Sequence, residues 1–415
     1  MTAIPAKNEL SPWKEILSGA VLVSALGYFV DIYDLILFSI VRVKSLTELG
    51  LSGDALLEKG VLLLNSQMLG MLLGGIIWGI MGDKLGRVKV LFGSILLYSV
   101  ANLSNAFVTN VDQYAILRFI AGIGLAGELG AAITLVSESL TVKGRGHGAT
   151  IVAAIGVSGA VFAGLIANLL TWRMAYAVGG VLGLSLLVLR MKTFESKMFE
   201  KSAESAQVPM GQFLSLFVKK ERFARYIKSI LIGVPLWFGV GILVTFSPEI
   251  AVHLGVTGPV SAGSAVMAMY GGLALGDLAS GLLSQKLKSR KKAAAIFMFF
   301  ALICSLVLSV AHGASPSLLY GIIFAMGIGM GYWAVFMMIA TEQFGTNLRA
   351  TVTTTVPNFV RGSVVLLTLG FTSLKTLFGT LAAAQIVGAI SFSLSFWAIV
   401  SIRETYGDDL DYLEK

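Results

Sequence analysis

"GIMGDKLGRVK", residues 79 to 89, separates two long apolar runs in the first part of the chain. Its glycines allow helix ends to approach closely, and its acidic and basic residues can form ion pairs with the ends of neighbouring helices. An ordinary basic loop between two membrane spans is the simpler interpretation. The spacing favours a conformational latch, formed by Gly79, Asp83, Gly86 and Arg87.

The composition around this motif is that of an integral membrane protein. Of the 415 residues, 56% are hydrophobic and 13% are charged, with a mean hydropathy of +0.84, whereas soluble domains carry about 25% charged residues. The net charge of +8 lies mostly in short segments between apolar runs, as expected for cytoplasmic loops. A nucleic-acid partner is therefore not indicated. The polar first residues lack a cleavable signal, so we expect the first span to act as an uncleaved one.

Twelve apolar runs are long enough to cross a bilayer, which takes about 20 residues each. They lie near residues 16–41, 60–81, 88–108, 112–137, 148–170, 174–190, 227–251, 260–283, 293–312, 316–340, 351–373 and 379–402. A polar and basic stretch divides them six and six. We therefore expect an N-terminal half at 1–190, a cytoplasmic linker at 191–226 and a C-terminal half at 227–415. Most of the 31 Lys and Arg residues then fall on the side of both termini, which predicts cytoplasmic termini.

An internal repeat links the two sets of runs. "GIG" at residues 122–124 recurs at 327–329, and "GIMGDKLGRVK" has a weaker echo, "GLLSQKLKSRK", at 281–291. An acid and an arginine seven residues apart also recur, and we expect them to anchor helix ends as part of the latch: Glu138 with Arg145, and Glu342 with Arg349. The common offset is half the chain, which predicts two pseudo-symmetric six-helix halves with a site between them.

Two motifs resemble those of the major facilitator superfamily. Residues 79–89 are similar to its signature loop, except that Val88 stands where a second basic residue is usual. "RFIAGIGLAGELGAAITLVSE", residues 118–138, is similar to the fourth helix of its phosphate, metabolite and aromatic-acid symporters. A dinucleotide site would need a preceding strand, which this apolar run excludes. The resemblance implies an all-α fold of twelve transmembrane helices and transport by alternating access.

The stretch "GYFVDIYDLILF", residues 27–38, places two acids three residues apart, on one face of an expected helix. Each costs about 2.5 to 3.5 kcal/mol at the centre of a bilayer. Related symporters carry a similar acid, aromatic, acid pattern, and the resemblance implies proton-coupling residues, here Asp31, Asp34 and Glu128. Arg118 is expected to be their ion-pair partner. The alternative is that the acids permanently neutralise a buried cation such as Arg118.

Near the middle of the eleventh run, an arginine and an asparagine share a face. They can bind an anionic substrate, and with an aromatic residue of the first run they give the expected substrate-binding set, Arg361, Asn358 and Tyr33. The alternative is that Arg361 pairs with a buried acid such as Asp277. Trp237, Tyr332 and Trp333 are candidates to line the cavity or to pack in the core.

These features predict a secondary active transporter, not an enzyme, with proton-coupled uptake of a small polar or anionic metabolite. An exporter or antiporter of drugs, metabolites or siderophores, with the same acids, and a membrane sensor without transport are the alternatives, and Na⁺ coupling stays open. No phosphate-binding loop is present, the three histidines are scattered, and we expect neither cofactor nor metal. The expected partners are the substrate, H⁺ and the lipid bilayer. We expect a monomer in a plasma membrane or a bacterial inner membrane.

Overall fold

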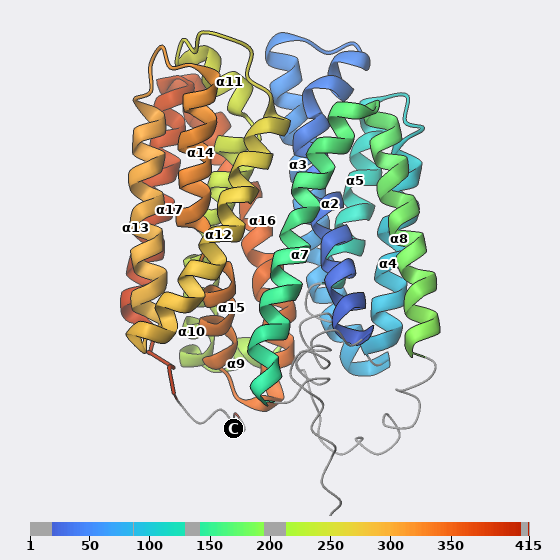
Figure 1. Cartoon of the computed structure of the whole chain (residues 1–415), viewed down its shortest axis with the longest axis vertical. Coiled ribbons are helices and arrows are strands. Elements are labelled where there is room, and N and C mark those ends of the chain that lie inside the picture. The colour runs from blue at the N-terminus through green and yellow to red at the C-terminus, as the bar shows by residue number, and fades with distance from the viewer. Residues whose placement is uncertain (1–18, 86, 129–141, 195–212, 408–413, 415) are drawn as a thin grey trace, which may run out of the picture.

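Long helices run side by side through the molecule in the computed structural model (Figure 1). The structure describes residues 19–85, 87–128, 142–194, 213–407 and 414. Within these ranges the regular secondary structure is entirely helical, and nine helices are long and apolar enough to cross a membrane. The prediction of an all-α integral membrane protein is confirmed.

The helices form two groups in chain order. The first group contains α2 (Gly19–Glu48), α3 (Gly53–Leu85), α4 (Arg87–Asn105), α5 (Val111–Leu125), α7 (Val142–Leu169) and α8 (Trp172–Phe194). The second contains α9 (Ser215–Val218), α10 (Lys220–Phe238), the π-helix η1 (Gly239–Val244), α11 (Ser247–His253), α12 (Ala262–Leu287), α13 (Arg290–Ser309), α14 (Pro316–Met330), α15 (Trp333–Glu342), α16 (Thr346–Phe378) and α17 (Thr380–Ser401). Each predicted apolar run overlaps at least one of these helices.

Two of the predicted runs are broken inside the second group. The seventh begins as α10, which contains Pro235, and continues as the wider η1 and then α11. The tenth is split into α14 and α15 at Gly331 and Tyr332. Such breaks leave backbone groups without helical partners, which in a membrane is tolerated only inside protein or beside a cavity.

Polar side chains cap the starts of some of the helices. The Asn110 side chain accepts a hydrogen bond from the backbone N–H of Gln113 at the start of α5. Ser289 and Ser315 do the same for α13 and α14. These caps satisfy orphan N–H groups of the first turn.

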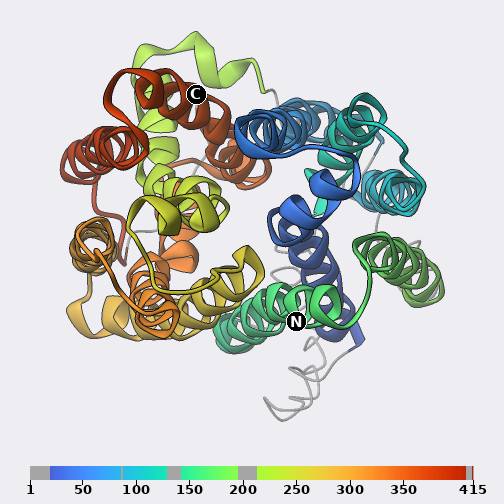
Figure 2. The same ribbon diagram turned by 90° about the horizontal axis from the view of Figure 1, so that it is seen from above.

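The repeated "GIG" glycines pack in the same way in both groups, which Figure 2 shows as two clusters of helices seen from above. A side chain at Gly122 of α5 would collide with the carbonyl of Gln67 on α3. A side chain at Gly327 of α14 would collide with the carbonyl of Met269 on α12. Close backbone approach thus fixes glycine at both positions, and the sequence repeat corresponds to a structural one.

The two groups meet along α2, α3 and α7 on one side and α12 and α16 on the other. The centres of α2 and α16 therefore face each other between the halves. The exact division at residues 190 and 227 stays a prediction.

Candidate functional site

The central site is built around an ion pair between the two halves. Asp31 of α2 and Arg361 of α16 are both fully buried, and Asp31 Oδ2 lies 3.5 Å from Arg361 Nη2. Arg361 thus pairs with a buried acid, as the alternative interpretation supposed, but that acid is Asp31 and not Asp277. At 3.5 Å this contact is at the long limit for a hydrogen bond.

Several polar atoms around this pair are buried and have no hydrogen-bond partner within the described part of the chain. They are Asp31 Oδ1, Arg361 Nε, Arg361 Nη1, Asn358 Oδ1 and Trp237 Nε1. An unpaired buried polar group costs about 1 to 3 kcal/mol, and natural proteins keep few of them. The central ion pair thus keeps donors and an acceptor that a polar ligand could use.

Aromatic side chains surround the Asp31–Arg361 pair. The Arg361 guanidinium carbon lies 6.0 Å from the ring centroid of Trp237 on α10. Tyr28 of α2 and Tyr270 of α12 lie within electrostatic range of both Arg361 and Asp31. A cation flanked by rings suits a flat anion, because the rings can stack on it while the guanidinium binds its charge.

Asp34 lies one helical turn beyond Asp31 and is also fully buried. Neither of its carboxylate oxygens has a hydrogen-bond partner among the described residues. Arg118 supplies the favourable charge that acts on the Asp34 carboxylate. The Asn102 side chain also interacts favourably with it. Asp34 is therefore a buried acid without a fixed ion pair.

Arg118 of α5 is held mainly by neutral groups. Its Nη2 donates to Asn102 Oδ1, its Nη1 donates to Gln67 Oε1 at 3.4 Å, and its guanidinium carbon lies 4.8 Å from the Tyr176 ring centroid. No salt bridge of Arg118 occurs within the residues that the structure describes. The predicted ion-pair partner thus acts on Asp34 through space.

Glu128 pairs with Arg190, the last residue of the sixth predicted apolar run, for which the sequence had indicated no role. Arg190 near the end of α8 donates from Nη1 and Nη2 to the two oxygens of Glu128, at 3.0 and 2.5 Å, and both side chains are fully buried. A side chain at Gly27 of α2 would collide with this pair. The two-pronged geometry is the strongest kind of carboxylate contact.

The two other predicted substrate residues lie close to the centre but are already bonded. Asn358 Nδ2 donates to the backbone carbonyl of Ala126 at 2.8 Å, across the two halves, and to its own helix. The Tyr33 hydroxyl donates to the carbonyl of Ala175 on α8, also at 2.8 Å. Asn358 keeps a free oxygen, whereas the Tyr33 hydroxyl is directed toward α8.

A family model described as Major Facilitator Superfamily matches residues 17–367, more than half of the chain. The chain belongs to the major facilitator superfamily. It resembles the niacin transporter NiaP of Acinetobacter baylyi, at 26% identity over 68% of this chain and 71% of that one. It also resembles the 3-(3-hydroxy-phenyl)propionate transporter of Escherichia coli strain K12, at 27% identity over 68% of this chain and 70% of that one.

A solved structure shows the same fold at lower sequence identity. The crystal structure of a D-xylose-proton symporter superposes with a TM-score of 0.69, covering 94% of this chain and 99% of that one at 17% identity. The fold of twelve transmembrane helices in two halves is thereby shown. The chain is a multi-pass membrane transporter and not an enzyme.

The major facilitator latch can be followed in the second half only. Glu342 at the end of α15 lies 3.5 Å from Arg290 at the start of α13, and it accepts a hydrogen bond from Thr405. Arg349 donates to the carbonyl of Phe344. Gly86 and Glu138 lie outside the described residues, as do the side chains of Asp83, Arg87 and Arg145. Gly79 lies on α3, facing Thr355 of α16.

Glu404, which follows α17, supplies an acid to this latch that the sequence motif lacks. It accepts hydrogen bonds from Ser289 Oγ and from the backbone N–H groups of Arg290 and Lys291. Partial burial favours a higher pKa of the Glu404 carboxyl, but these hydrogen bonds outweigh it and hold the pKa below its usual range. The sequence argument missed Glu404 because it lies more than a hundred residues from the motif.

A second ion pair joins the halves at the end of the bundle that carries α11. Arg42 of α2 is fully buried and lies 2.7 Å from Glu249 of α11. It also donates to the carbonyl of Thr245 and lies 4.7 Å from the ring of Phe246. Next to it, Thr245 Oγ1 donates to Ser39 Oγ at 2.9 Å. These contacts join the two halves at this end, and the sequence had indicated no role for Arg42.

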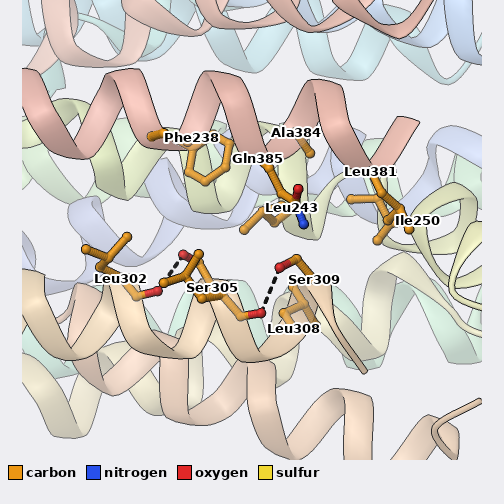
Figure 3. Close-up of a pocket in the computed structure, with 13 residues that line it drawn as sticks. Phe238, Leu243, Ile250, Leu302, Ser305, Leu308, Ser309, Leu381, Ala384 and Gln385 are labelled. Carbon is orange, nitrogen blue, oxygen red and sulfur yellow. Dashed lines mark hydrogen bonds between the residues drawn. The ribbon is translucent and has the colours of Figure 1, made fainter. Parts of the chain in front are cut away.

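A small groove lies away from the centre, between α10 with η1, α13 and α17 (Figure 3). Its cavity measures about 70 Å³, and its lining is mostly leucine and alanine. Ser305 and Ser309 in its wall donate to carbonyls of their own helix. It contains none of the predicted site residues. Within the described residues, no group of His, Cys, Asp and Glu side chains could hold a metal ion.

Proposed function

We propose that this major facilitator protein takes up a small aromatic or heterocyclic carboxylate together with a proton. The observation that carries the proposal is Arg361. Its guanidinium is buried between the halves, its contact with Asp31 is long, and its Nε and Nη1 have no partner in the described part of the chain. These two donors point to different sides of the guanidinium, and a substrate carboxylate can accept from either of them.

The aromatic side chains near Arg361, here called the aromatic wall, favour a particular organic group next to the substrate carboxylate. The Trp237 ring lies 6.0 Å from the cation, and Tyr28 and Tyr270 lie within its electrostatic range, so a ring attached to the carboxylate can gain contacts with aromatic side chains. Niacin and 3-(3-hydroxyphenyl)propionate, which name two relatives of this chain, are both ring-bearing carboxylic acids. This class fits the site better than phosphate, which brings no ring.

Asp31 couples the substrate to the proton, because Asp31 and the substrate carboxylate compete for one guanidinium. When Asp31 is ionised, Arg361 is held across the interface between the halves. When Asp31 takes up a proton, the attraction falls and Arg361 is free to bind the substrate anion. Asp34, buried without a hydrogen-bond partner among the described residues, provides a second place for a proton. Glu128, tied to Arg190 by two hydrogen bonds, is assigned to structure instead.

The proposal keeps the arrangement expected from the sequence. It comprises two halves at 1–190 and 227–415, a linker between them, and both termini in the cytoplasm. In this orientation the Arg42–Glu249 pair faces outward. The transporter works as a monomer in a bacterial inner membrane or a plasma membrane.

Flux into proteoliposomes tests the proposal. Nicotinate and 3-(3-hydroxyphenyl)propionate are offered under an imposed inward proton gradient, with a sodium gradient and D-xylose as comparisons. We expect accumulation of the acids that depends on the proton gradient alone and that a protonophore abolishes. Asp31→Asn should let the acids equilibrate without accumulating them. Asp54→Asn, which removes only an exposed contact with Lys375, is the matched control.

Three outcomes would contradict the proposal. Net extrusion of the acids driven by an inward proton gradient would identify an antiporter. Saturable binding without flux would identify a sensor. Accumulation driven by sodium would retain the substrate class and replace the coupling ion.

A further inference from the structure

The break between α14 and α15 places a helix start inside the second half. α14 ends at Met330 and α15 begins at Trp333, which is nearly buried. The first N–H groups of any helix lack partners within that helix. Tyr332, the residue at the cap position, does not cap α15 with its side chain, because its hydroxyl donates to the carbonyl of Ile232 instead. The start of α15 therefore needs an acceptor from elsewhere.

Asp277 of α12 supplies this acceptor. Its Oδ1 receives the backbone N–H of Ala334 at 3.0 Å, and the backbone N–H of Trp333 also points to this carboxylate. Asp277 is 9% exposed and forms no salt bridge within the described part of the chain. A carboxylate at a helix N-terminus is favoured by the hydrogen bonds and by the helix dipole. Asp277 thus has a complete local role without Arg361.

The start of α15 is connected to the central site through Trp333. The indole of Trp333 lies within hydrogen-bonding reach of the Tyr28 hydroxyl, and its ring packs against Phe336 with centroids 5.0 Å apart. Tyr28 in turn lies near both Asp31 and Arg361. A shift of the first turn of α15 would therefore move an aromatic side chain that supports the wall of the site.

We propose that Asp277 is a positioning residue for substrate binding: by capping α15 from the neighbouring helix, it fixes Trp333 and, through Trp333, Tyr28 against the bound ring. The proposal rests on the proposed function for its effect on substrate. The cap itself does not depend on the nature of the substrate.

Two substitutions separate capping from a role of the charge or of a proton. Asp277→Asn keeps an oxygen for the N–H of Ala334 but removes the charge, whereas Asp277→Ala removes the acceptor. We expect Asp277→Ala to raise KM for 3-(3-hydroxyphenyl)propionate about 10-fold, with the maximal rate within about 2-fold, the size of one lost capping hydrogen bond. Asp277→Asn should stay within about 3-fold of the wild type in KM. Ser280→Ala is the matched control, because the buried Ser280 hydroxyl donates to the carbonyl of Asp277 in its own helix.

Hydrogen exchange at the amides of Trp333 and Ala334 provides a readout that needs no substrate. Exchange there should accelerate about 10-fold in Asp277→Ala, little in Asp277→Asn, and not at all in Ser280→Ala. Should Asp277→Ala fail to fold, Asp277→Ser, with a shorter acceptor, is expected to fall between the wild type and the alanine variant. Equal loss of uptake in Asp277→Asn and Asp277→Ala with unchanged exchange would overturn the capping role. If no ring-bearing acid is transported, the proposed function fails, and the exchange data still decide the cap.

Discussion

The two halves share one helical framework but hold it together with different chemistry. Between α2 and α8 of the first half, Arg190 reaches the carbonyl of Val23 and pairs with Glu128. Between the corresponding helices α10 and α17 of the second half, the Ser395 hydroxyl donates to the carbonyl of Ile232 at 3.1 Å. The first half therefore concentrates fully buried charge, carried within the described residues by Asp31, Asp34, Arg42, Arg118, Glu128 and Arg190.

A second position shows the same divergence. Asp277 of α12 corresponds to Gly75 of α3 at the repeat offset of 202 residues. At Gly75 the space is filled by Asn358 from α16, whereas Asp277 uses its carboxylate to start α15. Duplication thus conserved the backbone contacts and left the side chains free to specialise. In our interpretation the first half carries the proton, and the second half supplies the cation and most of the aromatic wall.

The largest effect on uptake is expected for substitution of Arg361, the residue of the second half that contacts Asp31 of the first half. Arg361→Gln removes the cation from the centre and leaves Asp31 without its partner. We expect uptake of the acid, as kcat/KM, to fall at least about 100-fold, since a charged hydrogen-bonded contact of about 3 kcal/mol is lost. Initial rates in proteoliposomes provide the measurement.

Arg361→Lys is the control for charge without the planar edge, and we expect it to recover only part of the rate. Uptake by Arg361→Gln above a third of the wild-type rate would remove Arg361 from the site and leave the second half without a role in binding the anion.

An effect of comparable size, on stability and not on uptake, is expected at the charge pair that distinguishes the first half. Glu128→Gln leaves Arg190 buried without a counterion, and breaking one side of such a pair costs about 3 to 5 kcal/mol. The apparent Tm of the purified protein should therefore drop clearly. The double variant Glu128→Gln with Arg190→Met should regain most of the stability, because both charges are gone.

Proton-driven uptake by this double variant decides between structure and coupling. Accumulation that survives in the double variant assigns Glu128 to structure. Uptake that equilibrates without accumulating, in a protein of normal stability, would return Glu128 to the coupling residues that the sequence predicted.

The sequence predicted the framework better than the contacts within the site. Apolar runs and the glycine repeat depend on local patterns, so the helices and the two halves could be placed in advance. The choice of partners depends on which helices face each other across the halves, and no local pattern contains that information. Arg190, at the end of the sixth predicted run, was given no role for this reason, although α8 places it in the interior beside Glu128. The acids of α2 were found because charge in an apolar run is costly enough to be conspicuous.

Breaking the Arg42–Glu249 ion pair should have a smaller effect. This change tests whether the two halves separate at the end of the bundle that carries α11. Arg42→Gln removes the contacts with Glu249 and Thr245. In a Cys304→Ser background, labelling of Ser39→Cys by an impermeant maleimide should rise about 5-fold, a coupling of about 1 kcal/mol. Asp54→Asn breaks the exposed contact with Lys375 at the same end and should change labelling little, because exposed pairs contribute about 0 to 1 kcal/mol. Equal labelling in Arg42→Gln and Asp54→Asn would mean that the buried pair does not hold the halves together.

The smallest effect concerns Glu404, which gives the second half an acid where its motif has Gln285. Hydrogen bonds from Ser289 and from the start of α13 keep its pKa below the usual value despite partial burial. A group whose pKa is lowered by folding stabilises the folded state above its unfolded-state pKa, about 4.3 for Glu. That stabilisation is lost as the pH falls through the lower folded-state value. Because Glu404 is partly exposed, we expect about 1 kcal/mol or less.

Hydrogen exchange at the amides of Arg290 and Lys291, measured between about pH 6 and pH 3 against the unfolded peptide, isolates this contribution. Protection should decline below about pH 4 in the wild type, because protonation of Glu404 removes the charge that both N–H groups meet. In Glu404→Gln, the protection of these amides should be lower at pH 6 and should not change with pH, since the glutamine amide cannot titrate in this range. Parallel curves for the two proteins would show that the start of α13 is held by its own Ser289 cap, as α14 is by Ser315. The acid contributed from beyond α17 would then be dispensable to the latch.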